Sequence, residues 1–277
     1  MNWIRLESPA YWIVAVVTFL GVAYWESMRP KRPLSVSTER RWGNHAVILV
    51  MSTVAVGLLY RTSPVLVAAS FAGNRFGLLN KMWLPFAARF VLALLLLDFV
   101  KYLAHRFLHS VPVMWRMHQV HHSDPDFDVS TALRVHPLEL IFTQGVYLGI
   151  IAILAPPLSA VVLAEALSGL QSFFGHANAR LPGWIEGPLR TIFITPDMHR
   201  IHHSAEVAEQ LANFGDSFPW WDRLLGTYVA TPAAGQDGMV MGLKGSQDPG
   251  SLSLGFMLQQ PFRPAPPEMS DNRPVGL

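Results

Sequence analysis

The chain has 277 residues, of which 51% are hydrophobic and 14% charged, with a formal net charge of +2 and a mean hydropathy of +0.29. This balance is typical of an integral membrane protein, and without a run of basic residues it argues against nucleic-acid binding. The chain has no cysteine, which excludes disulfides, thiolate metal sites and iron–sulfur clusters. Any metal must therefore be held by nitrogen and oxygen ligands.

Five apolar stretches are each close to the roughly 20 residues that cross a bilayer core. They lie at 10–25, 45–60, 83–104, 138–155 and 157–174. The first lacks the basic start and cleavage site of a signal peptide, so we expect a membrane anchor. Ala155-Pro156-Pro157 separates the last two, which predicts a helical hairpin because proline interrupts a helix. The sequence thus predicts an all-α integral membrane protein with about four to five transmembrane helices.

Basic residues predict the orientation of these spans. The link between the first two spans carries Arg29, Lys31, Arg32, Arg40 and Arg41. The next link carries Arg61, Arg75 and Lys81. Cytoplasmic loops are enriched in lysine and arginine, so we expect the richer first link to be cytoplasmic. Counting spans from there places every histidine cluster on the cytoplasmic side.

Ten of the eleven histidines fall within 105–203, and eight of them form the clusters HRFLH (105–109), HQVHH (118–122) and HRIHH (199–203). Histidines three or four residues apart share one helix face, and imidazole is the commonest protein ligand of transition metals. We therefore expect these eight to bind more than one metal ion. His136 and His176 stand alone, and spacing leaves a ligand role and a structural role equally open. His45 is expected to be structural.

Acidic side chains accompany the histidines along the predicted helices. Asp98 and Tyr102 share one helical stripe with His105 and His109. A carboxylate inside a membrane span usually has a functional partner, so we expect Asp98 to accept a hydrogen bond from a metal-bound histidine. The alternative is a pair with Lys101.

Further acids are weaker candidates. Glu165, on a stripe with His176, is either a site residue or a helix-packing residue. Asp197 and Asp222 either orient ligand histidines or, for Asp222, pair with an arginine. The acids of DPDFD (124–128) are expected to form a solvated loop.

These motifs resemble those of the fatty acid hydroxylase/sterol desaturase superfamily of integral-membrane di-iron oxygenases. The resemblance covers about residues 95–230 and rests on D-x3-Y-x2-HR-x2-H, HQVHHS, STALRVHPLE, His176, TPDMHRIHHS and NFGDSFPWWDRLLGTY. It implies a cytoplasmic helical cap that holds a dinuclear metal site. The implied ligands are His105, His109, His118, His121, His122, His136, His176, His199, His202 and His203.

The resemblance also implies two iron ions, O2 as co-substrate, and a sterol-like, fatty acyl or alkyl-ether membrane lipid as substrate. Some fatty-acid 2-hydroxylases of the family carry a paired histidine box where this chain has GHANARLP, and His136 is the candidate to replace the missing ligand. The chain carries no fused cytochrome b5 domain. We therefore expect a separate electron donor of the cytochrome b5, ferredoxin or reductase type. Hydroxylation and desaturation stay open, as does the oligomeric state.

Two other classes of protein use similar residues. A membrane zinc metallohydrolase would need a glutamate base, and the chain has no HExxH motif. A histidine-rich metal transporter would place its ligands near the bilayer midplane. We expect residues 1–230 to form the membrane-embedded domain and residues 231–277 a Pro/Gly-rich cap or tail with PAPPE near its end. Within that tail, 252–262 either follows the membrane surface or covers the cap.

Overall fold

The structure, a computed structural model, describes residues 9–71 and 76–263. Arg75 and the PAPPE segment lie outside these ranges. Every regular element within the described ranges is a helix, which confirms the all-α prediction. The long helices are α1 (Pro9–Met28), α2 (Thr38–Tyr60), α5 (Phe86–Ser110), α7 (Pro137–Leu154) and α8 (Leu158–Gly175), with the short α3 (Pro64–Ser70) and α4 (Leu78–Lys81) between α2 and α5.

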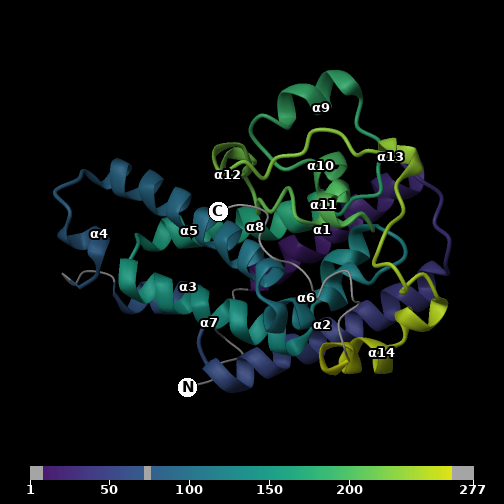
Figure 1. The fold of residues 1–277 in the computed structure, drawn as a ribbon. Coiled ribbons are helices and arrows are strands. Elements are labelled where there is room, and N and C mark those ends of the chain that lie inside the picture. Colours follow the sequence, from purple (N-terminus) through teal and green to yellow (C-terminus); the bar gives the residue numbers. More distant parts are fainter. Residues whose placement is uncertain (1–8, 72–75, 264–277) are drawn as a thin grey trace.

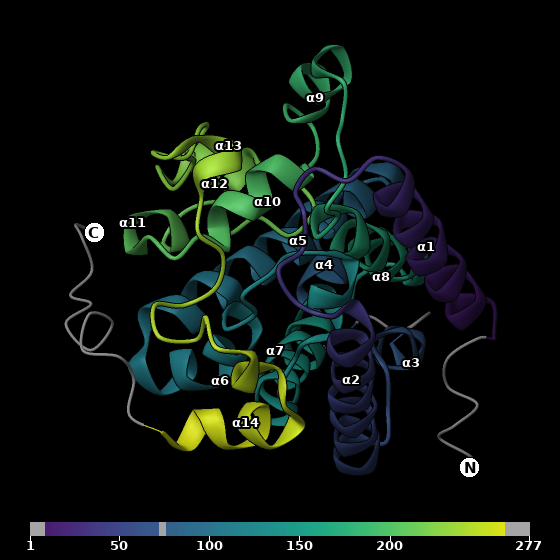
Figure 2. The same cartoon turned by 90° about the vertical axis from the view of Figure 1, so that its right-hand side faces the viewer.

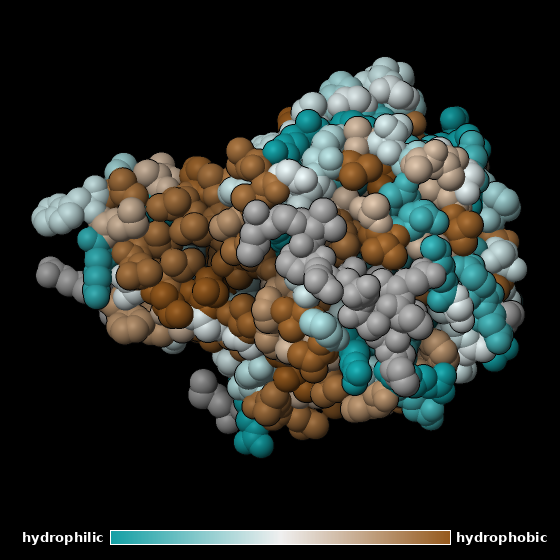
Figure 3. Space-filling view, viewed as in Figure 1, coloured by the Kyte–Doolittle hydropathy of each residue, from teal (hydrophilic) through white to brown (hydrophobic). Residues whose placement is uncertain are grey.

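Three segments of the described chain are long and apolar enough to cross a membrane: Thr38–Ser70, Pro137–Leu154 and Leu158–Gly175. Helices α7 and α8 form the predicted hairpin, because Ala155 ends α7 in the left-handed conformation (φ 45°) and Pro157 precedes α8. Helix α5 contacts both arms of this hairpin. The part of the surface that lies over α3, α5 and α7 is largely hydrophobic, whereas the opposite edge is hydrophilic (Figures 1 and 3).

Short helices form a second layer, which we call the cap. They are α6 (Pro112–His122), η2 (Val129–Leu133), α9 (Gly183–Leu189), α10 (Pro196–His202), α11 (Val207–Gln210), α12 (Trp220–Leu224), α13 (Gly235–Gly238), η3 (Pro249–Leu252), α14 (Leu254–Gln259) and η4 (Gln260–Phe262). Helix α6 begins immediately after α5, because Pro112 disfavours the helical conformation at Val111 (φ −104°, ψ 119°) and turns the chain. This turn brings HQVHH beside HRFLH.

A buried ion network joins the basic link to the cap. Arg41 is fully buried and donates to the carboxylates of Asp124 (Nη2–Oδ2, 2.7 Å) and Asp128 (Nη1–Oδ2, 2.6 Å). Asp126 accepts hydrogen bonds from the backbone of Ser35 and Val36. The expectation of a solvated DPDFD loop is therefore wrong, because the basic link covers all three acids. The link lies on the same side of the molecule as the cap.

The segment 252–262 covers the cap. Helix α14 packs against α2, and η4 packs against α6 (Figure 2). The Gln260 carbonyl accepts a hydrogen bond from the Gln119 side chain (3.1 Å), and the Gln260 side chain accepts one from the Ser123 hydroxyl (2.9 Å). Of the two predicted positions for this segment, the structure shows the cover over α6.

Candidate metal centre

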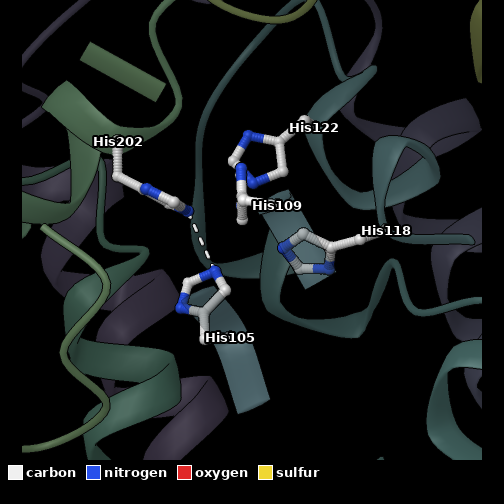
Figure 4. A group of neighbouring side chains, drawn as sticks. All are labelled: His105, His109, His118, His122 and His202. Carbon is white, nitrogen blue, oxygen red and sulfur yellow. Dashed lines mark hydrogen bonds between the residues drawn. The ribbon is translucent and has the colours of Figure 1, made fainter. Parts of the chain in front are cut away.

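Nine of the ten predicted ligand histidines lie in two adjacent groups. In each group, one ring nitrogen of every member lies within 4.8 Å of those of the other members. The first group comprises His105, His109, His118, His122 and His202, whose rings converge on one point (Figure 4). The second comprises His121, His176, His199 and His203. The ring centroids of His122 and His203 are 4.4 Å apart, so the groups adjoin.

Each HxxHH box is divided between the two groups. On α6, His118 and His122 point into the first group and His121 into the second. At α10 the pattern reverses, because His199 and His203 enter the second group and His202 the first. Residues i and i+4 share a helix face more closely than residues i and i+3. Each box therefore contributes to two neighbouring histidine groups and does not surround one.

Four of the nine grouped histidines have Nδ1 at hydrogen-bond distance from an acceptor oxygen. Three of these acceptors are carbonyls: Phe214 for His105 (2.9 Å), Ala212 for His202 (2.7 Å) and Ser172 for His176 (2.7 Å). The fourth is the carboxylate of Glu139, 2.8 Å from Nδ1 of His118. A carbonyl can only accept, so the rings of His105, His202 and His176 carry their proton on Nδ1 and leave the Nε2 lone pair free for a metal.

These lone pairs face one another at metal-ligand spacing. The Nε2 atoms of His105 and His202 are 3.0 Å apart, and that of His176 is 3.2 Å from Nε2 of His121 and 3.0 Å from Nε2 of His199. Because His105 and His202 both carry the proton on Nδ1, no hydrogen bond joins their Nε2 atoms. Adjacent ligands on an ion with bonds of about 2.1 Å stand about 3 Å apart. The residues present therefore fit a bound metal in each group.

Burial supports the same conclusion. Both ring nitrogens of His109 and of His122 are buried and have no hydrogen-bond partner among the described residues. Unpaired polar atoms in the interior are costly unless an ion satisfies them. Burial also holds the pKa values of His121, His122, His199 and His203 well below the ordinary value of 6.5, and neighbouring imidazoles lower them further. The neutral ring is the form that binds a metal.

Three predicted side chains contact the loop 213–227 and not the histidines themselves: Asp98, Tyr102 and Asp222. The carboxylate of Asp98 accepts from the Ser217 backbone (3.0 Å) and the Trp221 indole (2.7 Å), so the predicted direct contact with a histidine is wrong. Asp222 accepts from the backbone N–H groups of Phe214 and Gly215 (both 2.8 Å) and from the Thr227 hydroxyl (2.7 Å).

The Tyr102 hydroxyl lies 2.9 Å from that same hydroxyl of Thr227. All three side chains thus hold the loop 213–227, whose Phe214 carbonyl in turn orients His105.

The remaining candidates lie outside both groups. Glu165 pairs with Lys101 (3.3 Å), and Asp197 pairs with Lys31 (2.9 Å) and Arg200 (2.6 Å). His136 begins α7, where its Nδ1 accepts a hydrogen bond from the Leu138 backbone (3.1 Å). The structure does not bring His136 to either group, because its ring caps the helix.

Glu139 is the site residue that sequence reasoning missed. It lies in the HPLE segment, three residues after His136, and is 6% exposed. One feature of the local sequence could have indicated its role: it is an acidic residue in the first turn of an otherwise apolar helix. Its partner His118 lies 21 residues upstream on another helix, so spacing along one helix could not connect them.

A cavity of about 330 Å³ extends from the histidines between α5, α7 and α8. Members of both groups line it, including His105, His121 and His176. Much of the wall is apolar, for example at Leu108 and Leu140. The cavity therefore connects the metal centre with the membrane-embedded part of the molecule.

Fold and site together define a helical membrane protein with two adjoining histidine groups, each of which could hold a metal ion. The model of the fatty acid hydroxylase family matches residues 90–227, about half of the chain, and this range contains all ten predicted ligands. The chain belongs to the fatty acid hydroxylase/sterol desaturase superfamily.

Several curated proteins are similar to this chain. An ornithine lipid hydroxylase, OlsE of Rhizobium tropici, is 32% identical over 180 residues, 64% of this chain and 51% of that protein. The alkylglycerol monooxygenase of Homo sapiens is 35% identical over 140 residues, 50% of this chain and 30% of that protein. A very-long-chain aldehyde decarbonylase, GL1-11 of Oryza sativa subsp. indica, is 27% identical over 160 residues, 58% and 59% of the two chains. The matches to the first two thus cover about half and less than a third of those relatives' own lengths. No solved structure gives a significant match.

Proposed function

We propose that this chain is an O2-dependent di-iron oxidoreductase that hydroxylates or desaturates a C–H bond of a membrane lipid. The observation that carries the proposal is the pair of histidine groups at the end of a cavity between membrane helices. Lipid hydroxylase and monooxygenase relatives support the substrate class. Two bound iron ions would supply the activation of O2 that oxidation of an alkyl C–H bond requires.

The chain's own residues hold and orient this chemistry. The nine histidines would provide nitrogen ligands, and hydrogen bonds at Nδ1 fix the rings of four of them. Helices α5, α7 and α8 position the lipid, and the apolar walls of the cavity exclude water from the reacting carbon. In hydroxylation, one oxygen atom of O2 enters the C–H bond and the other leaves as water, which consumes two electrons and two protons.

We also propose that the cap faces the cytoplasm. The basic link follows the rule for cytoplasmic loops and contacts the cap through Lys31–Asp197 and the Arg41 network. A separate donor of the cytochrome b5, ferredoxin or reductase type would deliver the electrons on that side.

The test is substitution of one histidine from each group. In His202→Ala and in His121→Ala we expect iron per chain, measured by elemental mass spectrometry, to fall by half or more and lipid-dependent O2 uptake to be lost. His136→Ala is the matched control and should retain iron. If both variants kept iron and oxidation, the ligand assignment would be wrong. A zinc-only protein that hydrolyses its substrate without O2 uptake would refute the oxidative function.

A further inference from the structure

A polar subsite lines the membrane end of the cavity. Lys101 on α5 donates to Glu165 on α8 (Nζ–Oε1, 3.3 Å), and its ammonium lies 4.8 Å from the centre of the Tyr147 ring on α7. Asp216, in the loop that Asp98 and Asp222 hold, lines the same cavity. Lys101 is one helical turn from His105, and Glu165 is about 16 Å along α8 from His176. We call Lys101, Tyr147, Glu165 and Asp216 the polar subsite.

An alkyl chain is a poor occupant of this subsite. The side chains of Lys101 and Glu165 each keep 23% of their surface accessible although they lie among membrane helices. Covering an ion pair with methylene groups removes its remaining hydration and returns no hydrogen bond. A polar group in the same place replaces the lost water. At the polar subsite, the cavity therefore selects the polar part of a lipid over its hydrocarbon part.

The charges of the subsite favour a cation. Lys101 contributes one positive charge, whereas Glu165 and Asp216 contribute two negative charges. Glu165 is already paired with Lys101. In the described part of the chain Asp216 takes part in no ion pair and accepts a hydrogen bond of 3.3 Å from the Ser217 hydroxyl. An ammonium group offers both the charge and the N–H donors that this carboxylate can accept.

The cavity volume limits how much of a lipid enters. A volume of about 330 Å³ is at the small end of the roughly 300–1,000 Å³ found for ligand cavities. It holds a head group and a few carbons, so the long tails remain in the bilayer. The carbon that reaches the histidines then lies within the short, head-group-sized segment that the cavity admits.

We propose that the polar subsite binds an ammonium group on the head group of the substrate lipid, so that the oxidised carbon lies in the head group or next to it. Glu165 and Asp216 accept from the ammonium, and Lys101 keeps Glu165 in place. This inference rests on the proposed function for the oxidation itself. Recognition of the amine is a binding property that requires neither turnover nor electrons.

The binding test uses the full chain in phosphatidylcholine nanodiscs and two defined probes, N-palmitoylputrescine and its N-acetylated derivative, which lacks the positive charge. We expect the free amine to bind at least tenfold more tightly. In Glu165→Gln and in Asp216→Asn this preference should fall below threefold. Glu206→Gln, an exposed cap residue, is the matched control and should keep it. Equal binding of the two probes by the unaltered chain overturns the proposal, as does a preference that survives both substitutions.

A second measurement separates this proposal from the proposed function. Tandem mass spectrometry of lipids from cells with and without the protein locates the added oxygen. We expect it in the head-group fragment. Oxygen far along the acyl chain would overturn the polar subsite as the substrate-positioning element and leave the oxidative function intact. If His121→Ala and His202→Ala kept both iron and oxidation, the ligand assignment would fail and the polar subsite would stand, because amine binding does not require iron.

Discussion

Removal of the Glu139 carboxylate should weaken metal binding through His118. The bond from His118 Nδ1 to Glu139 Oε1 is 2.8 Å long, and both side chains are more than 90% buried. A hydrogen bond to a charged group contributes about 1.5–3 kcal/mol. Loss of such a partner to a ligating histidine typically lowers metal affinity about 10–100-fold, which is about 1.4–2.7 kcal/mol. The two magnitudes agree, so we expect Glu139→Ala to lower iron affinity by one to two orders of magnitude.

The assay is competition between the protein and a chelator of known iron affinity, with bound iron measured by elemental mass spectrometry. Glu139→Gln should have a smaller effect, because its amide oxygen still accepts the Nδ1 proton. Glu209→Gln is the matched control, since Glu209 is equally buried (6%) but accepts from the Ala233 backbone, away from the histidines. An iron affinity of Glu139→Ala within twofold of the unaltered chain would refute the reasoning.

Three further predictions concern stability. Arg41→Met should lower the free energy of unfolding by about 3–5 kcal/mol, because it removes the guanidinium that pairs with two buried carboxylates. The exposed Arg40→Met should leave it unchanged, and equal denaturant midpoints of the two variants would contradict this. Gly215→Ala should lower the free energy of unfolding by about 1–3 kcal/mol, since the added Cβ would lie 2.7 Å from the Phe218 carbonyl oxygen. Gly187→Ala is the control, because a Cβ there meets open space. Equal thermal unfolding of the two variants would contradict the prediction. Removal of metal by a chelator should lower the melting temperature by several degrees, because only the folded chain brings the histidines together. An unchanged melting temperature would show that the histidines hold no structural metal.

Local periodicity predicted what lies on single helices and missed what joins different ones. The i, i+3 and i+4 spacing of HQVHH and HRIHH correctly indicated that these histidines gather together, and Ala155-Pro156-Pro157 correctly indicated the hairpin. Spacing could not show that each box divides between two groups, because that depends on how α6 and α10 face each other.

Acidic residues were the least predictable because their partners are distant in the chain. The DPDFD acids resemble a surface loop until Arg41, more than 80 residues upstream, is packed against them. In the same way, Asp98 could be placed on the histidine stripe of α5, but the loop that it holds begins more than 100 residues later.

The division of each HxxHH box has a consequence for how the centre fills. Helices α6 and α10 each contribute histidines to both groups, so an ion bound in one group would also restrain the rings of the other. The entropic cost of ordering these helices would then weaken mainly the binding of the first ion, and the second ion would bind to a preformed site. Loading should therefore be positively cooperative, with chains that carry both ions or neither outnumbering those that carry one.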